Sequence, residues 1–277
     1  MPTPALTMPK PKEHGAWGML YIPLVTAVGI SGTWNVRLFL MALTVTLIFL
    51  SQRPYSQLLT NKRLPQDGRL WRRNLIWLAV YWTASGILIS LLYFHCGLKV
   101  LPQFAWIGVP VAAAFTWFLK RNRMRTVVGE LVGICGLTLT APLAHYASVG
   151  QVQPVGFWLW GLCILYFASS VFYVKAVVAN CLKARSRSMV EPIDRQLCGS
   201  YHLGLLALMS GLAALGQVPV ILLLAFLPVI ARGLLGMRER NAKLNFARIG
   251  WTEVAYSLFF ALLTALAIRG VERTLPL

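Results

Sequence analysis

Three of the eight acidic residues stand at the start of apolar segments, and they are the first candidates for chemistry: Glu13, Glu130 and Glu253. A carboxylate beside hydrocarbon is costly unless a cation or a hydrogen-bond donor partners it. Histidine titrates near neutral pH, and His14 lies next to the first of these acids. The sequence therefore predicts His14, Glu130 and Glu253 as the residues that would transfer protons in catalysis.

Five further polar residues are expected at the same depth: Arg53, Tyr55, Tyr173, Lys175 and Asn180. Lys175 lies inside an apolar run, where its ammonium must either extend to the membrane surface or pair with a carboxylate. We expect Arg53 and Lys175 to bind an anionic head group, and the two tyrosines and the asparagine to orient it. The alternative is that each glutamate simply occupies a first helical turn, where the helix dipole favours an anion.

Other chemistries lack their motifs. The four histidines show no metal-binding spacing, the five cysteines contain no CxxC pair, and neither a G-x-S-x-G elbow nor a phosphate-binding glycine loop is present. The sequence predicts no metal site and no cofactor. Hydrolases and nucleotide-driven pumps are disfavoured on the same grounds.

Long apolar segments must position these residues. The chain is 57% hydrophobic and 12% charged, and its apolar runs have the length that crosses a bilayer. We predict an all-α polytopic membrane protein that forms a single transmembrane domain over residues 1–277. Its nine spans are expected at about 15–32, 36–51, 74–94, 101–119, 127–147, 155–178, 199–216, 218–236 and 250–269.

Charge sets the expected orientation. Of the 26 lysines and arginines, 22 fall in the N-terminus, in alternate loops or at the span ends that adjoin those loops, all on the face that the positive-inside rule assigns to the cytoplasm. We therefore predict a multi-pass protein of the cell membrane with its N-terminus inside and its C-terminus outside. The net charge of +18 is attributed to this topology and to anionic lipid, not to nucleic acid. Protein partners are not predicted.

Several motifs resemble the YwiC-like family of bacterial membrane proteins. The most specific is the opening Lys12-Glu13-His14-Gly15-Ala16-Trp17, with Pro23 and Gly29 behind it. The others are Arg53-Pro54, Gly129-Glu130-Leu131-Val132-Gly133 with Ala141-Pro142, and Gly250-Trp251-Thr252-Glu253. The resemblance implies a membrane protein but no particular reaction.

A weaker resemblance is to the UbiA-type prenyltransferase superfamily, and it rests on the stretch Asn61 to Arg69 after the second span. It implies a nine-helix bundle with a polar site at the cytoplasmic loops after spans two and six. Those enzymes hold a prenyl diphosphate through magnesium on aspartate-rich motifs. This chain offers only Asp67 on the first loop, and Asn180, Glu191 and Asp194 at the second. Magnesium is therefore disfavoured, and an arginine and lysine clamp is expected instead.

These observations give one hypothesis and two alternatives. The hypothesis is a UbiA-like bundle that binds or modifies an isoprenoid or another amphipathic lipid with an anionic head in a cytoplasm-facing cavity. If the protein is an enzyme, it would be a UbiA-like transferase acting on lipid. The alternatives are a small transporter or channel with a Glu, Lys and His relay, and a non-catalytic membrane assembly factor.

Overall fold

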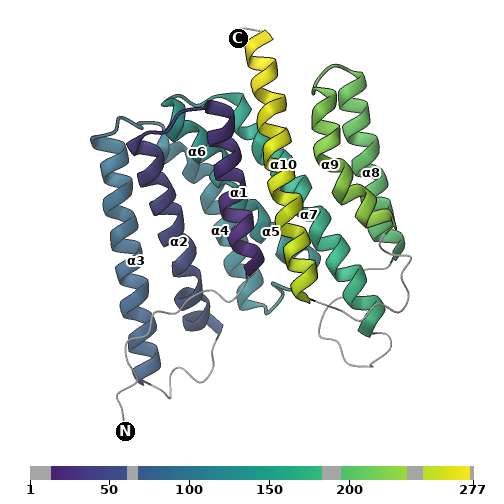
Figure 1. The fold of residues 1–277 in the computed structure, drawn as a ribbon. Coiled ribbons are helices and arrows are strands. Elements are labelled where there is room, and N and C mark those ends of the chain that lie inside the picture. The colour runs from purple at the N-terminus through teal and green to yellow at the C-terminus, as the bar shows by residue number, and fades with distance from the viewer. Residues whose placement is uncertain (1–13, 61–67, 183–194, 236–245, 275–277) are drawn as a thin grey trace.

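The computed structural model describes residues 14–60, 68–182, 195–235 and 246–274, and these residues form an all-helical bundle (Figure 1). Among these described residues, seven helices are long and apolar enough to cross a membrane, and two shorter apolar helices, Gly15–Ser31 and Val220–Leu235, bring the candidate crossings to nine. The predicted all-α polytopic fold is therefore confirmed. The elements are α1 His14–Ser31, α2 Val36–Thr60, α3 Gly68–Phe94, the short 3-10 helix η2 Leu101–Phe104, α4 Ala105–Lys120, α5 Val127–Thr138, α6 Thr140–Val149, α7 Pro154–Leu182, α8 Arg195–Ala214, α9 Val220–Leu235 and α10 Phe246–Thr274.

The crossings alternate in direction, so that α1 begins and α10 finishes at opposite ends of the bundle (Figure 1). We call the end where α2, α4, α7 and α9 finish the basic end, because Arg53, Lys120, Arg125 and Arg232 lie there. That this end faces the cytoplasm stays a prediction from the charge distribution.

Several helices run past the hydrocarbon length at the basic end. The second span was expected to finish at residue 51, but α2 continues through Pro54 to Thr60. Polar residues such as Gln52 and Arg53 form helix well, and a helix can continue in the interfacial region where water satisfies backbone groups. Arg53 and Tyr55 therefore lie on a helix and not in the loop that follows it.

The fifth crossing is broken near its middle. α5 ends at Thr138 and α6 begins at Thr140. Pro142 explains the break, because proline lacks the N–H that would bond to the carbonyl of Thr138 and its ring clashes with that carbonyl. The Thr140 hydroxyl instead donates to the Leu20 carbonyl at 2.8 Å, which ties α6 to α1.

The core lies among α1, α6, α7, α9 and α10, where aromatic and small residues interlock. Tyr166 of α7 stacks on Phe260 of α10 with ring centroids 4.2 Å apart, and Phe226 of α9 packs edge-on against both. At the periphery, α3 packs chiefly against α2. α4 also lies at the periphery: none of its residues is fully buried, and its outward face is available to lipid.

Candidate functional site at the basic end

Lys175 is the most deeply buried cation of the predicted set. Its residue is 3% exposed, on the face of α7 that packs against α5. The ammonium lies 3.0 Å from Glu130 Oε1 and donates to the Arg125 carbonyl at 2.5 Å. Of the two outcomes that the sequence left open for this lysine, the structure therefore shows pairing with a carboxylate.

Glu130 is held by the start of its helix. The Thr126 side chain caps α5 by accepting from the Gly129 N–H at 3.1 Å, and this places Glu130 in the first turn. The helix dipole favours an anion there, and Lys175 supplies a full charge in addition. The dipole explanation and the pairing explanation thus both apply to this carboxylate.

Glu253 forms a second ion pair on the other side of α7. Its Oε1 pairs with the Arg232 guanidinium of α9, and its Oε2 accepts from the Ser170 hydroxyl of α7 at 2.6 Å. The guanidinium also lies over the Tyr173 ring at 4.3 Å and the Tyr256 ring at 5.4 Å. This cluster joins α7, α9 and α10 at the basic end.

The two ion pairs lie on different faces of α7. Ser170 and Lys175 are five residues apart, which turns their side chains about 140° from each other around the helix axis. The structure therefore brings Glu130 together with Lys175, and Glu253 together with Tyr173 through Arg232. It does not bring the two glutamates into one cluster.

Tyr55 lies apart from both ion pairs, between α2 and α4. Its hydroxyl hydrogen-bonds to Thr116 Oγ1 at 2.9 Å, and its ring lies 6.1 Å from that of Trp82. Arg53 is half-buried two residues earlier on α2, so it leaves the helix on nearly the opposite side. The predicted head-group cation and the predicted orienting tyrosine of α2 do not share a face.

The side chains of His14 and Asn180 lie outside the described residues, although the backbone places His14 at the start of α1 and Asn180 near the end of α7. Glu13 also lies outside. Within the described residues, no group of three or more His, Cys, Asp or Glu side chains is placed to hold a metal ion.

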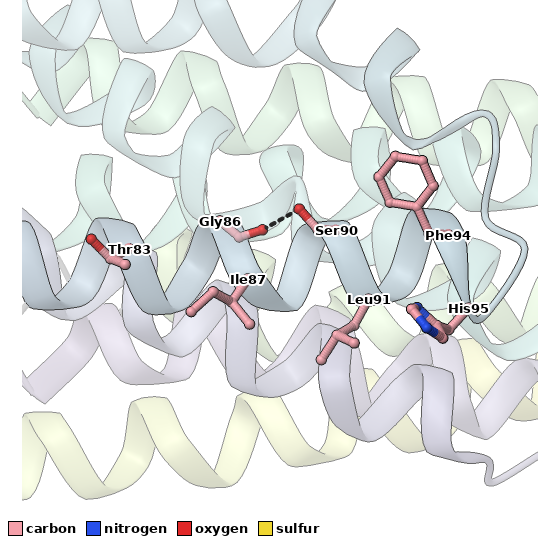
Figure 2. Close-up of a pocket in the computed structure, with 7 residues that line it drawn as sticks. All are labelled: Thr83, Gly86, Ile87, Ser90, Leu91, Phe94 and His95. Atoms are coloured by element: carbon pink, nitrogen blue, oxygen red, sulfur yellow. Dashed lines mark hydrogen bonds between the residues drawn. The ribbon is translucent and has the colours of Figure 1, made fainter.

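Two hollows on the sides of the bundle, formed by described residues, are considered as sites. One, of about 410 Å³, is lined by a single face of α3 that includes Thr83, Ile87 and Ser90, and by His95 directly after the helix (Figure 2). The other, of about 480 Å³, is lined by Val109, Ala112, Ala113, Thr116, Trp117 and Lys120 of α4. We call the second the α4 groove. Only the α4 groove has a cation among its lining residues.

Comparison with known proteins finds a similarity over much of the first half of the chain. Residues 11–145 match the model of a family described as YwiC-like protein. This region is therefore similar to the YwiC-like family. A relative in Bacillus subtilis (strain 168), described as "Uncharacterized protein YwiC", is 25% identical over 173 residues, which are 61% of this chain. The match covers 66% of the relative, slightly less than two thirds of its length. No solved structure matches the chain.

The predicted resemblance to the YwiC-like family is confirmed, whereas the UbiA-like bundle stays a prediction. The YwiC-like region includes His14, Arg53, Tyr55 and Glu130 and ends before α7. Lys175, the partner of Glu130, therefore comes from outside the matched region, and their ion pair joins the two parts of the chain.

Sequence reasoning missed Arg232 and Ser170, the partners of Glu253. The signal for Arg232 was present, because this arginine falls inside the predicted span 218–236 in the same way that Lys175 falls inside its own. An intramembrane cation calls for a carboxylate partner wherever it occurs. Ser170 gave no such signal, because serine is common in membrane helices.

Proposed function

We propose that the protein binds an amphipathic lipid with an anionic head, with the hydrocarbon chain in the α4 groove and the head at the basic end. The observation that supports this most directly is the groove itself. Its lining is apolar from Val109 to Ala113 and ends at Lys120. This order of chemistry along the helix matches that of a lipid whose chain lies in the membrane and whose charge lies at the surface.

The surroundings of Lys120 favour an anion. The neighbouring Arg121 guanidinium lies over the Trp117 ring at 5.2 Å, and Trp117 is 47% exposed. Tryptophan with a basic neighbour is typical of the membrane interface, where head groups lie. The ammonium and the guanidinium of these consecutive residues would hold a phosphate or carboxylate through charge-assisted hydrogen bonds.

Tyr55 gives the groove a fixed wall. Its hydroxyl bonds to Thr116, whose own hydroxyl donates to the Ala112 carbonyl at 2.7 Å. Both threonine contacts lie beside the groove, so α2 holds α4 at the depth where chain and head would meet. In this proposal Tyr55 positions the groove wall and does not itself touch the reacting part of a substrate.

Chemical modification of the lipid would need a free acid or base. Glu130 and Glu253 are each engaged in an ion pair, and in each pair the carboxylate is more exposed than its cation, with side-chain exposures of 34% and 22%. Acid–base roles for these residues, with His14, remain part of the hypothesis and require one pair to open. A relay through both glutamates would have to pass around α7.

Lipid composition provides the test. The full-length protein and its Lys120→Ala and Ala113→Phe variants would be purified in a mild detergent, and their co-purified lipids identified by mass spectrometry. We expect Lys120→Ala to lower the ratio of anionic to zwitterionic lipid. We expect Ala113→Phe, which fills the groove, to lower the total lipid per protein. The matched control is Ile87→Phe, which fills the α3 hollow (Figure 2) that has no cation in its lining.

Equal lipid content and equal anion enrichment in all four proteins would refute the proposal. The exposure of α4 also fits the assembly-factor alternative, in which a partner helix covers it. That alternative predicts a different result, namely that Ala113→Phe removes a co-migrating protein on native gels and leaves the lipid unchanged.

A further inference from the structure

One face of α3 carries a row of buried polar side chains with unsatisfied atoms. Asn74, Tyr81 and Ser85 are 1%, 2% and 4% exposed, and Trp77 lies between them on the same face. The amide nitrogen and oxygen of Asn74, the indole N–H of Trp77 and the hydroxyls of Tyr81 and Ser85 have no hydrogen-bond partner among the described residues. We call these four residues the α3 seam.

The seam is costly in a membrane unless something bonds to it. Each polar group left unsatisfied in an apolar medium costs several kcal/mol, and hydrocarbon offers no water nearby. Three buried threonines elsewhere in the bundle are satisfied: the Thr26, Thr44 and Thr138 hydroxyls each donate to a carbonyl of their own helix at 2.7 Å. Isolated exceptions occur at the Ser148 and Thr264 hydroxyls, which have no partner among the described residues. The seam departs from this pattern at four successive turns.

The spacing within the seam suits a small ligand that both donates and accepts. Successive members are three or four residues apart, a rise of about 4.5–6 Å along the helix. Two hydrogen bonds of about 2.8 Å placed end to end span a similar length. A water molecule between neighbours would therefore bridge one side chain to the next, and water needs two to four such partners to be held.

The seam runs from the basic end of α3 toward the middle of the membrane. Its row begins beside Arg73, whose Nε is likewise buried without a hydrogen-bond partner among the described residues, at the basic end of α3. From there Ser85 lies twelve residues further along, about 18 Å into a hydrocarbon layer of about 30 Å. A ligand that entered at the basic end would reach roughly the middle of the bilayer.

We propose that the α3 seam binds a file of water molecules that enters from the basic end between α2 and α3. The seam is distinct from the α4 groove, and it stands whether or not that groove binds lipid. α3 packs chiefly on α2, so water has to pass only one helix interface. The seam gives protons and water a path to mid-membrane that the bundle core, packed with aromatic rings, does not offer.

The opposite face of α3 provides a natural comparison. Thr83 and Ser90 are small polar residues at similar depths, but they point away from α2 into the exposed hollow of Figure 2. The Ser90 hydroxyl donates to the Gly86 carbonyl at 2.8 Å and needs no other partner. A cysteine at either position would face lipid, whereas a cysteine at Ser85 would face the seam.

The test measures the reaction of single introduced cysteines with a charged, membrane-impermeant methanethiosulfonate. The full-length chain would carry Ser85→Cys, Asn74→Cys, Thr83→Cys or Ser90→Cys, and peptide mass spectrometry would locate the label. The native Cys163 and Cys198, both fully buried, serve as internal unreactive controls. Only a hydrated thiol ionises and reacts, so we expect Ser85→Cys to react on the order of a hundredfold faster than Thr83→Cys.

Two further measurements test from which side of the membrane the reagent enters and whether a substitution at the mouth of the seam blocks it. In inverted membrane vesicles, which expose the expected cytoplasmic face, Ser85→Cys and Asn74→Cys should react faster than in intact cells. Adding Asn74→Leu at the mouth should slow the Ser85→Cys reaction at least tenfold, whereas Leu75→Met, on the exposed side of the same turn, should leave it unchanged. The proposal is overturned if both seam cysteines are as unreactive as Thr83→Cys and Ser90→Cys, or if Asn74→Leu has no effect.

Discussion

Gly233 of α9 is the position where one added methyl group should disturb the basic end most. A Cβ at Gly233 would overlap the imidazole of His202 on α8 at three ring atoms. The ring has little room to move, because its Nδ1 donates to the Cys198 carbonyl at 2.7 Å and its Nε2 lies 3.0 Å from Ser169 Oγ. His202 is also fully buried. Gly233→Ala must therefore push α9 away from α8 or displace the ring.

The size of the effect follows from three contributions. Overpacking a well-packed interior costs about 1–3 kcal/mol. Displacing the ring loses two hydrogen bonds, each of about 0.5–1.5 kcal/mol. Alanine is about 1 kcal/mol better than glycine in a helix, which offsets part of this loss. We expect Gly233→Ala to lower the free energy of unfolding by about 3 kcal/mol, and its neighbour Arg232 to lose alignment with Glu253.

The free energy would be measured by unfolding in mixed micelles with increasing SDS, followed by far-UV circular dichroism. Gly204→Ala is the matched control, because Gly204 lies on the same helix as His202 with open space around it. It should stabilise by about 0.5–1 kcal/mol. Adding His202→Ala to Gly233→Ala should cost less than the sum of the two single changes. If Gly233→Ala is as stable as Gly204→Ala, the packing argument is refuted.

Two further predictions concern the ion pairs and a third concerns packing at the start of α5, and all three use the same unfolding measurement. Lys175→Met should lower the free energy of unfolding by about 1–2 kcal/mol, a modest loss because Glu130 is partly exposed. Adding Glu130→Gln to the same chain should recover most of that loss. If the two substitutions instead cause independent, additive losses, the pairing is contradicted. Glu253→Leu should cost more than Arg232→Leu, because the guanidinium that it strands is the more buried partner, so the opposite order would count against the pair. Gly129→Ala should cost about 1–3 kcal/mol, because its Cβ would lie 2.5 Å from a backbone carbonyl of the preceding loop, and a neutral result would show that the loop yields.

The sequence predicted the helices closely because the bilayer imposes their length. Observed bounds such as 101–120 for η2 with α4 and 127–149 for α5 with α6 lie within two residues of the expected spans 101–119 and 127–147. The two largest differences occur at the basic end, where α2 ends at Thr60 and not at residue 51, and α3 begins at Gly68 and not at residue 74. Hydropathy locates hydrocarbon, and it contains no information on where a helix stops once it has left hydrocarbon.

The contacts within the candidate site were less predictable, because the sequence indicates the depth of each residue in the membrane but not the side of its helix that faces the bundle. Glu130, Lys175 and Glu253 do lie near the same end, as their positions in the spans indicated. Which of them meet depends on the rotation of each helix about its axis, and packing sets that rotation. For the α3 seam, the spacing of three and four residues is visible in the sequence. Only the structure shows that this face is buried and that its polar atoms lack partners among the described residues.

The structure gives local reasons for most of the basic residues that lie at the end of the bundle opposite the basic end. Arg269 donates from Nε to the Ile30 carbonyl at 3.0 Å and packs against Gly32, whose φ of +66° marks the end of α1. Arg37 lies against Gly150, which has a φ of +85° and ends α6. A cation at a helix C-terminus is favoured by the dipole, so these two arginines stabilise the ends of α1 and α6. Lys99 lies 4.4 Å from the Tyr93 ring centroid and has a cation–π partner. Three of the four basic residues at the end opposite the basic end therefore stabilise local structure. They do not weaken the inference, drawn from the other 22 basic residues, that the basic end faces the cytoplasm.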